Sequence, residues 1–190
     1  MIFLRLFLFL GLVFHKLVWE IMKRQGPSSS QKQKPETSFL KSVLKGLKAL
    51  FLLFIIIQTL FLDLFPITDQ SLPLRIFGVV LYSLGLAIAV MGRVQLGNNW
   101  ANVEDYQIVS NQKLINTGIY RFIRHPIYAG DILLLIGLEL ALNSWLVLGI
   151  LILIPYIYWQ AKAEESLLLN TFPDYNEYKK NSKMFIPYLI

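Results

Sequence analysis

The chain has 190 residues, of which 55% are hydrophobic and 16% are charged, and its formal net charge is +6. This composition is too apolar for an ordinary soluble domain, and basic residues scattered over the ends of apolar runs argue against a nucleic-acid-binding face. The sequence has no cysteine and only two histidines, His15 and His125, which excludes disulfides and a cysteine nucleophile and predicts that no metal is bound.

The first apolar run covers residues 2–19 and predicts a membrane-spanning helix. A signal peptide is disfavoured because the basic N-terminal region is nearly absent and no small-residue cleavage site follows. His15 is expected to lie at the interface near the end of this helix and not to be a ligand. Residues 20–38 are rich in Ser, Lys and Gln, which predicts a flexible cytoplasmic loop, with partner docking as the alternative.

Two more spans are predicted over residues 49–65 and 74–92. Lysines at helical spacing precede the second span, and Pro66 stops it. The third span carries small residues at a seven-residue interval on one face, where a neighbouring helix can approach closely. These residues are Gly78, Gly85 and Gly92.

Residues 93–124 are too polar to span and form a connector with turn-forming residues and a short alternating stretch around 107–115. Two helices follow over residues 127–142 and 145–159, joined by a tight turn. Both are near the lower length limit for a span, so they form either a short hairpin or two full crossings. The fifth helix is predicted to continue beyond the membrane as an amphipathic extension that ends at Pro173.

The connections after the first and third spans and the C-terminal tail are rich in Lys and Arg, whereas the other two connections are nearly free of them. The positive-inside rule then places the N-terminus outside and the three polar regions in the cytoplasm. The predicted fold is therefore all-α, a polytopic membrane protein with about five transmembrane helices and a cytoplasmic pocket.

Residues 117–130 read TGIYRFIRHPIYAG, an unusually polar cluster in an apolar chain. Pro126 suits the first position of a helix and leaves the following N–H groups unpaired, so that Arg124, His125 and the helix start together favour an anionic group. The alternative is that the two cations only contact phospholipid headgroups at the end of a span.

Four acids lie in or beside the last helices. Glu164 and Glu165 are adjacent and cannot act as a facing pair from one helix, so one is expected to face inward, toward a cation or ribose hydroxyls, and the other to meet solvent or Lys162. Asp131 and Glu139 lie inside an apolar helix, where acids generally face a cavity or a partner. A structural role and a functional role both remain open for Asp131, and Glu139 is expected to approach the far interface.

The pattern G-x-Y-x-x-x-R-H-P-x-Y-x-G over residues 118–130 is followed by the Glu pair and by F-x-x-Y-x-x-Y, at Phe172, Tyr175 and Tyr178. A late proline, Pro187, and the upstream run LGNNW complete the set. This ordered set resembles the isoprenylcysteine carboxyl methyltransferase family. The resemblance covers about residues 93–190, which makes this the catalytic region, with the three helices of residues 1–92 as an N-terminal unit.

The resemblance implies an S-adenosylmethionine site and an amphiphilic or prenylated acceptor that enters from the bilayer, with a carboxylate as the methylated group. Membrane lipid is a further expected partner. The implied cofactor-binding residues are Gln112, Lys113, Leu114, Ile115, Tyr120, His125, Pro126, Ile127, Tyr128 and Glu164. Arg124 would orient the motif or the acceptor. Where family members usually carry an arginine that meets the substrate carboxylate, this chain has Gln160, which can hydrogen-bond a carboxylate but cannot neutralise it.

Methyl transfer from a sulfonium to an anionic acceptor needs no general base, so the site has only to position the reactants and exclude water. Two other functions remain open on the sequence alone. One is an NADPH-dependent membrane reductase of sterol-reductase type, which has similar C-terminal topology. The other is a non-catalytic protein whose basic segments bind anionic lipid.

Overall fold

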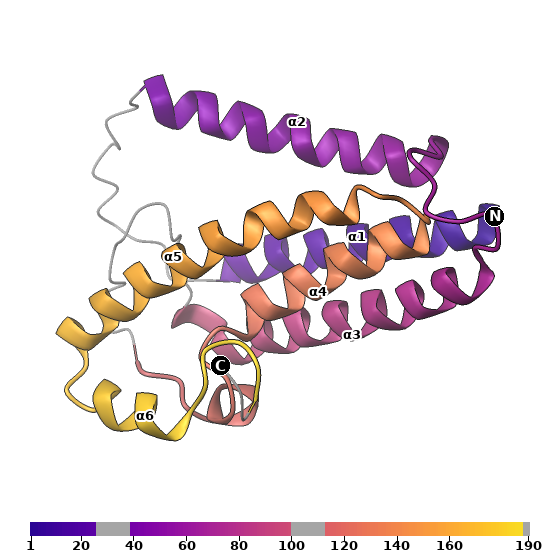
Figure 1. Ribbon diagram of the computed structural model, residues 1–190. Helices are drawn as coiled ribbons and strands as arrows, with labels where there is room; N and C mark the ends of the chain where they lie inside the picture. Colours follow the sequence, from indigo (N-terminus) through magenta and orange to yellow (C-terminus); the bar gives the residue numbers. More distant parts are fainter. Residues whose placement is uncertain (26–38, 100–112, 188–190) are drawn as a thin grey trace.

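The computed structural model describes residues 1–25, 39–99 and 113–187, and within these residues it is helical without strands (Figure 1). This confirms the predicted all-α fold. The α-helices are α1 (Ile2–Gln25), α2 (Phe39–Phe61), α3 (Leu72–Leu96), α4 (Pro126–Ala141), α5 (Val147–Thr171) and α6 (Tyr175–Asn181). Two short 3-10 helices, η1 (Gly97–Asn99) and η3 (Gly118–Arg121), flank the segment between α3 and α4.

The five long helices alternate in direction, so the described connections gather at two opposite ends of the molecule (Figure 1). One end holds the N-terminus, the α2–α3 link and the α4–α5 turn. The other end holds η1, η3, α6 and the C-terminal segment. The polar motif at residues 117–130 therefore lies at the same end as the tail, as expected from five alternating helices.

Several helix boundaries differ from the predicted ones; among them, α2 begins at Phe39 instead of residue 49, and α3 ends at Leu96 instead of residue 92. α1 continues to Gln25, so residues 20–25 are helical and not part of a loop; the Glu20–Arg24 ion pair at 3.1 Å and the basic last turn stabilise this extension. The rest of the predicted loop lies outside the described residues. α2 ends at Phe61 instead of residue 65, and Phe65, which directly precedes Pro66, has a positive φ of 49° that lies outside the helical range.

α3 and α4 pack with their backbones in close approach. A Cβ atom added at Gly85 would collide with the backbone of Leu134, and one added at Gly137 would collide with the backbone of Tyr82. Only glycine permits this separation, since any side chain would push the helices apart. The glycine face predicted on the third span is thus confirmed, and α4 contributes glycines of its own to the contact.

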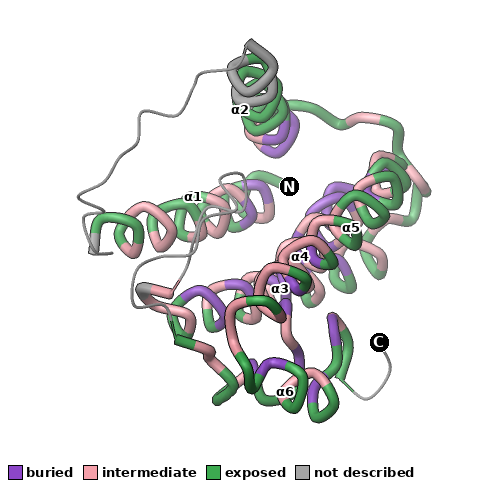
Figure 2. Tube along the Cα trace, turned by 90° about the vertical axis from the view of Figure 1, so that its left-hand side faces the viewer, coloured by how far each residue is buried: buried purple, intermediate pink, exposed green. Residues whose placement is uncertain are grey.

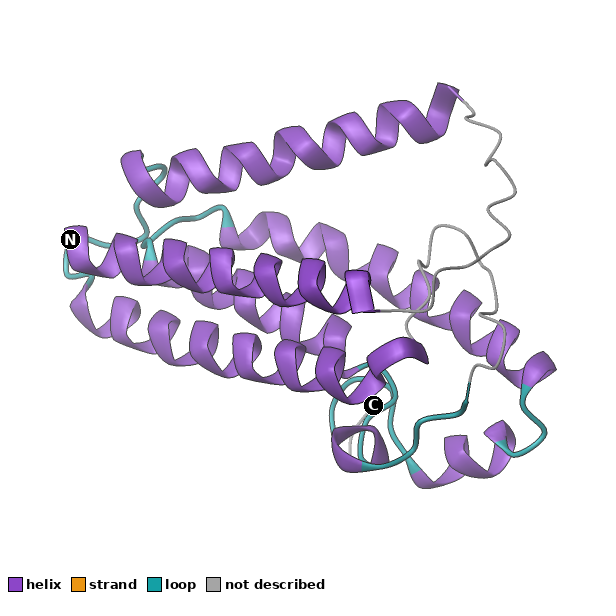
Figure 3. Ribbon diagram, turned by 180° about the vertical axis from the view of Figure 1, so that it is seen from behind, coloured by secondary structure: helices purple, strands orange, loops and turns teal. Residues whose placement is uncertain are grey.

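α2 lies apart from the other helices in both Figure 1 and Figure 3 and is attached mainly through polar groups. Arg5 of α1 is buried and donates hydrogen bonds to the carbonyl oxygens of Gln58 (3.0 Å) and Thr59 (2.9 Å) and to the Asp63 carboxylate (2.7 Å). The Gln58 amide in turn donates to Glu139 of α4 at 2.7 Å. Glu139 therefore connects two helices through a buried contact near the C-terminal end of α4, and its predicted approach to the far interface stays a prediction.

The α4–α5 turn is hydrogen-bonded to the α2–α3 link. Asn143 adopts a positive φ of 60°, its side-chain amide donates to the carbonyl oxygen of Thr68 (2.8 Å), and its own carbonyl accepts from Ile67 (3.0 Å). The tight turn predicted at Asn143 and Ser144 is confirmed. Asparagine tolerates this backbone conformation better than most residues, which explains its place here.

Among the described residues, two helical stretches are long and apolar enough to cross a membrane, Ile2–Arg24 and Leu72–Leu96. The number of full crossings, five, stays a prediction. Exposed positions run along α1, α2 and α5 (Figure 2), and many of them are large apolar residues such as Phe3, Phe51 and Ile152. Such an outer surface suits contact with lipid.

Candidate active site at the start of α4

The segment that leads into α4 is tied to the end of α3. Gly118 has a φ of +59° and leaves no room for a Cβ atom beside the Gln95 side chain, whose oxygen accepts a hydrogen bond from Ile119 N–H at 2.8 Å. The Tyr120 hydroxyl donates to the carbonyl oxygen of Gly92 (3.2 Å). These contacts explain why the motif begins with glycine and tyrosine, and they add Gln95, which the sequence pattern did not single out.

The C-terminal segment pairs with the motif along the backbone. Arg124 N–H donates to the carbonyl oxygen of Lys183 (2.8 Å), His125 N–H donates to that of Met184 (3.0 Å), and Lys183 N–H donates to that of Phe122 (3.0 Å). Residues 122–125 and 183–184 thus form a short parallel pairing. The tail is a structural part of the site, although no local pattern in the sequence indicates it.

Glu165 forms ion pairs with cationic side chains from two other parts of the site. Its carboxylate lies 2.7 Å from Nε of Arg124 and 3.0 Å from Nζ of Lys179, and its side chain is only 2% exposed. Arg124 is also nearly buried, and its guanidinium donates to the backbone carbonyls of Lys179 and Ser182. Arg124 and Glu165 therefore join the motif, α5 and α6 in one buried cluster.

The charge state of Glu165 follows from these neighbours. Burial by itself raises the pKa of a carboxyl group, but the His125 imidazole at 3.5 Å and the charged groups of Arg124 and Lys179 outweigh it and hold the pKa of Glu165 well below its usual range. Nearby, burial raises the pKa of the Tyr120 hydroxyl, and the negative charge of Glu164 adds to this increase. At neutral pH the cluster contains an ionised glutamate and a neutral phenol.

Glu164 has different surroundings from its neighbour. Its side chain is 36% exposed, accepts a hydrogen bond from the Tyr128 hydroxyl (3.2 Å), and lies 3.8 Å from Nδ1 of His125. One acid faces inward and the other stays accessible, as expected for adjacent residues on a helix. Of the two surroundings expected for the outward acid, solvent and Lys162, the structure shows solvent, since Lys162 lies over the Tyr158 ring at 5.6 Å.

His125 stands immediately before α4, with Pro126 in the first helical turn. Its imidazole is buried, stacks on Tyr128 with a centroid separation of 5.5 Å, and packs against Phe185 of the tail at 5.7 Å. The His125 side chain makes no capping hydrogen bond to the helix, and its Nε2 atom has no hydrogen-bond partner among the described residues. The first turn of α4 therefore keeps donor groups that a bound anion can use.

Six of the residues predicted for the site meet at the start of α4. They are Arg124, His125, Pro126, Ile127, Tyr128 and Glu164, with Tyr120 in the adjacent η3. Lys113, Leu114 and Ile115 lie in the segment before η3, where Lys113 N–H donates to the Asn99 side chain (2.6 Å). Gln160 is half-buried on α5, one turn before Glu164, and Gln112 lies outside the described residues.

A second polar pair adjoins the site from α1. Nε2 of His15 lies 2.9 Å from a carboxylate oxygen of Asp131, and its ring stacks on Trp19 at 4.0 Å. Asp131 thus has a partner, as expected for an acid in an apolar helix, but the sequence offered no way to identify it. The two residues are separated by 116 positions.

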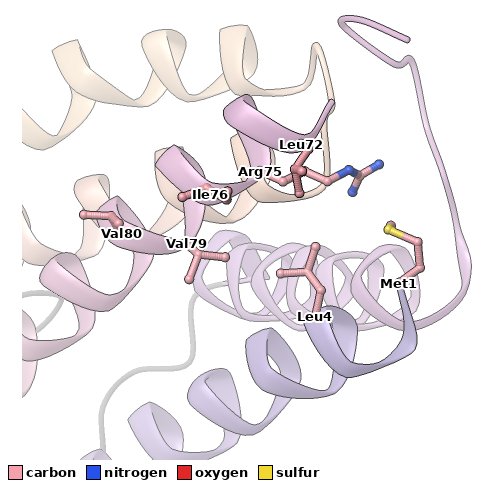
Figure 4. Close-up of a pocket in the computed structure, with 7 residues that line it drawn as sticks. All are labelled: Met1, Leu4, Leu72, Arg75, Ile76, Val79 and Val80. Carbon is pink, nitrogen blue, oxygen red and sulfur yellow. The ribbon is translucent and has the colours of Figure 1, made fainter. Parts of the chain in front are cut away.

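A cavity of about 360 Å³ lies at the other end of the molecule, between the N-terminal parts of α1 and α3 (Figure 4). Its lining is apolar except for Arg75: Met1, Leu4, Leu72, Arg75, Ile76, Val79 and Val80. The residues of the candidate site are absent from this lining. This cavity is therefore not the predicted cytoplasmic pocket, which stays a prediction.

The sequence of this chain is similar to those of several known proteins. Residues 74–174, more than half of the chain, match the family model for phospholipid methyltransferases. The chain is 28% identical over 117 residues to protein-S-isoprenylcysteine O-methyltransferase of Saccharomyces cerevisiae, covering 60% of this chain and 49% of that protein. It is 29% identical over 111 residues to the cobalt-zinc-cadmium resistance protein CzcN of Cupriavidus metallidurans, covering 56% and 47%.

The chain spans about half the length of these curated relatives. Among solved structures, the eukaryotic intramembrane Ras methyltransferase, an isoprenylcysteine carboxyl methyltransferase, has a similar fold, with a TM-score of 0.63 at 20% identity over 93% of this chain and 63% of that one. The family match and the apolar helices identify an integral membrane protein. The resemblance to isoprenylcysteine carboxyl methyltransferases is confirmed, and the chain belongs to the phospholipid methyltransferase family.

Proposed function

We propose that this protein is an S-adenosylmethionine-dependent methyltransferase that acts at the membrane interface on an amphiphilic acceptor. The observation that carries the proposal is the pairing of an uncapped helix start with an accessible acid. The first turn of α4 offers N–H donors beside His125, and the partly exposed Glu164 lies 3.8 Å from that histidine. The site therefore holds a place for a negative group and a place for a positive group side by side.

This pair of charges fits the cofactor. S-adenosylmethionine has a carboxylate, an ammonium group and a sulfonium cation at one end, and when bound it supplies an activated methyl group. The helix start and His125 would hold the carboxylate, and Glu164 would face the positive groups. Tyr120 and residues 112–115, which the resemblance also implies, would complete the binding surface.

The other residues of the site position the reactants. Arg124 is surrounded by Glu165 and by carbonyl oxygens of the tail, so its contacts support the motif-orienting role rather than direct binding of the acceptor. The tail covers His125 through Phe185 and thereby excludes water from one side. In-line transfer to an ionised acceptor needs this alignment and dry surroundings and no general base.

We infer that the methylated group is a carboxylate, which forms a methyl ester. Relatives of the chain are named protein-S-isoprenylcysteine O-methyltransferases, which supports a prenylcysteine-like or other lipid-like acceptor. Gln160 would offer a hydrogen bond to this carboxylate in place of a charge. The charge asymmetry of the connections favours a cytoplasmic active site and an external N-terminus.

Calorimetry of the detergent-solubilised protein with the cofactor and with its demethylated product tests the proposal. We expect micromolar-range binding that is lost in Glu164→Ala and in His125→Ala. Glu177→Gln, at an exposed position of α6, serves as the control and should bind normally. Binding of NADPH in place of S-adenosylmethionine would indicate a reductase, and binding of neither, on folded protein, would leave the anionic-lipid-binding alternative.

A further inference from the structure

The N-terminal parts of α1 and α3 enclose a cavity that the candidate active site does not use. The two helices touch at Gly11, where an added Cβ atom would collide with the Tyr82 ring, and the Tyr82 hydroxyl donates to the carbonyl oxygen of Leu8 at 2.6 Å. Further toward the N-terminal ends, around Leu4 and Ile76, lies the cavity of about 360 Å³ (Figure 4). The cavity therefore begins where the close contact between the two helices ends.

The walls of this cavity suit hydrocarbon and not water. Apart from Arg75 the lining side chains are all apolar, whereas a buried water requires two or more polar partners. Leu72, Ile76 and Val80 are each at least 50% exposed, so the cavity is continuous with the apolar outer surface of the helices. A hydrocarbon chain can thus enter sideways from a bilayer and restore the dispersion contacts that an unfilled space between helices lacks.

Arg75 lines the cavity, and the protein does not neutralise its charge. Its Nε atom donates to the Ser71 hydroxyl (2.8 Å) and its Nη1 atom to the carbonyl oxygen of Ala141 (2.9 Å), both of which are neutral groups. The charges of Asp63 and Arg5 also act on Arg75, but they have opposite signs and pair with each other at 2.7 Å. In the parts of the chain that the structure describes, no carboxylate forms an ion pair with Arg75.

The position of Arg75 is unfavourable for a cation that has no counter-charge. Arg75 lies in the first turn of α3, where the helix dipole disfavours positive charge. The other two arginines that connect helices, Arg5 and Arg124, each contact a carboxylate at 2.7 Å. Ionisable residues in apolar helices generally pair with an opposite charge, so Arg75 requires an anion that the described chain does not supply.

We propose that this cavity binds an anionic phospholipid, with an acyl chain between α1 and α3 and the phosphate at Arg75. The apolar walls accept the chain, and the guanidinium group, held in place by Ser71 and Ala141, donates to the phosphate oxygens. Phosphatidylglycerol should bind more tightly than phosphatidylcholine, because choline brings a second positive charge close to Arg75. This lipid is not the methyl acceptor, since the cavity and the candidate active site lie at opposite ends of the molecule (Figure 1).

Native mass spectrometry of the detergent-solubilised full chain, with phosphatidylglycerol and phosphatidylcholine of identical acyl chains, tests the inference. We expect the wild type to bind phosphatidylglycerol roughly 10-fold more tightly, because hydrogen bonds to charged groups are involved. Arg75→Gln should remove this preference. Val79→Phe, which places a ring in the cavity and keeps Arg75, should weaken the binding of both lipids. The control Arg24→Gln removes an exposed arginine at the other end of α1 and should keep the preference.

Thermal unfolding supplies a second measurement, because Arg75→Gln also removes the contact with Ala141. We expect phosphatidylglycerol to raise the melting temperature of the wild type and of Arg24→Gln, since a ligand of the folded state stabilises it, but not that of Arg75→Gln or Val79→Phe. Glycerol phosphate, the head without chains, should cause no rise.

Three results would overturn the inference. The first is equal binding of the two lipids by the wild type, and the second is an unchanged preference in Arg75→Gln. The third is a rise in melting temperature with glycerol phosphate equal to that with the lipid, which would show that the cavity takes no acyl chain. Dimers in the mass spectrum that Val79→Phe dissociates would assign the cavity to a second copy of the chain and would also overturn it.

Discussion

Glu164 and Glu165 are neighbours in the sequence but have opposite surroundings. Glu165 is enclosed by Arg124, His125 and Lys179, whereas Glu164 is a third exposed beside Tyr128. Removal of one partner from a buried ion pair leaves the other charge uncompensated in a medium of low polarity. The two acids should therefore respond differently to substitution, one through stability and the other through binding.

We expect Glu165→Gln to destabilise the protein at pH 7 by about 3 kcal/mol or more, because Arg124 stays buried without its counter-charge. The pKa of Glu165 in the folded protein lies below its unfolded value of about 4.3. The contribution of Glu165 to the free energy of unfolding is therefore fully present above that pH and is lost as the pH falls through the folded pKa. In detergent, the melting temperature of Glu165→Gln should therefore lie well below that of the wild type at pH 7, and this difference should shrink toward pH 3. A difference that stays constant down to pH 3 would contradict this account, and Glu164→Gln should unfold like the wild type.

At the scale of helices, the contact between α3 and α4 holds the site in position. α3 carries Gly92, which receives the Tyr120 hydroxyl, and α4 begins with the residues that form the proposed cofactor site. Because both helices approach at glycines, a small change in their separation moves the start of α4 relative to α5.

Alanine substitutions at two glycines measure this contact. Gly85→Ala should destabilise the protein strongly, because the added methyl group meets the backbone of Leu134, which cannot move without displacing α4. Gly149→Ala on α5 is the matched control, since a Cβ atom there has no neighbour within 4 Å. The readout is the melting temperature in detergent together with cofactor affinity. Equal melting temperatures for the two variants would show that the helices tolerate a wider separation.

At the scale of the whole molecule, the described connections divide between two ends (Figure 1). The absence of cysteine makes this division easy to test, because each introduced cysteine is the only thiol in the chain. Asp69 in the α2–α3 link and Asn176 in α6 are both exposed and lie at opposite ends.

In intact cells, a maleimide that cannot cross the membrane should label Asp69→Cys, because the positive-inside rule places the α2–α3 link outside. It should label Asn176→Cys only after the cells are permeabilised. The reverse pattern would invert the proposed orientation, and labelling of both in intact cells would contradict the proposed number of crossings.

The positions of the helices and the main motif were predictable from the sequence, because both depend on residues close together in the chain. Apolar runs predicted the long helices, and the seven-residue spacing of Gly78, Gly85 and Gly92 predicted the face that meets α4, since helical periodicity places such residues on one side. The residues at the start of α4 were likewise recognisable from Pro126 and the polar cluster around it.

The contacts between groups far apart in the chain could not be predicted from the sequence. Glu165 is 41 positions from Arg124, the tail pairs with the motif from 58 or more positions away, and His15 is 116 positions from Asp131. Local periodicity determines the face on which a side chain lies, but its partner depends on the path of the whole chain and on which helices pack together. For this reason the helices and the residues at the start of α4 were predictable from local sequence patterns. The contacts of Glu165 with Arg124 and Lys179, the packing of Phe185 on His125 and the contact of His15 with Asp131 depend on how the whole chain folds.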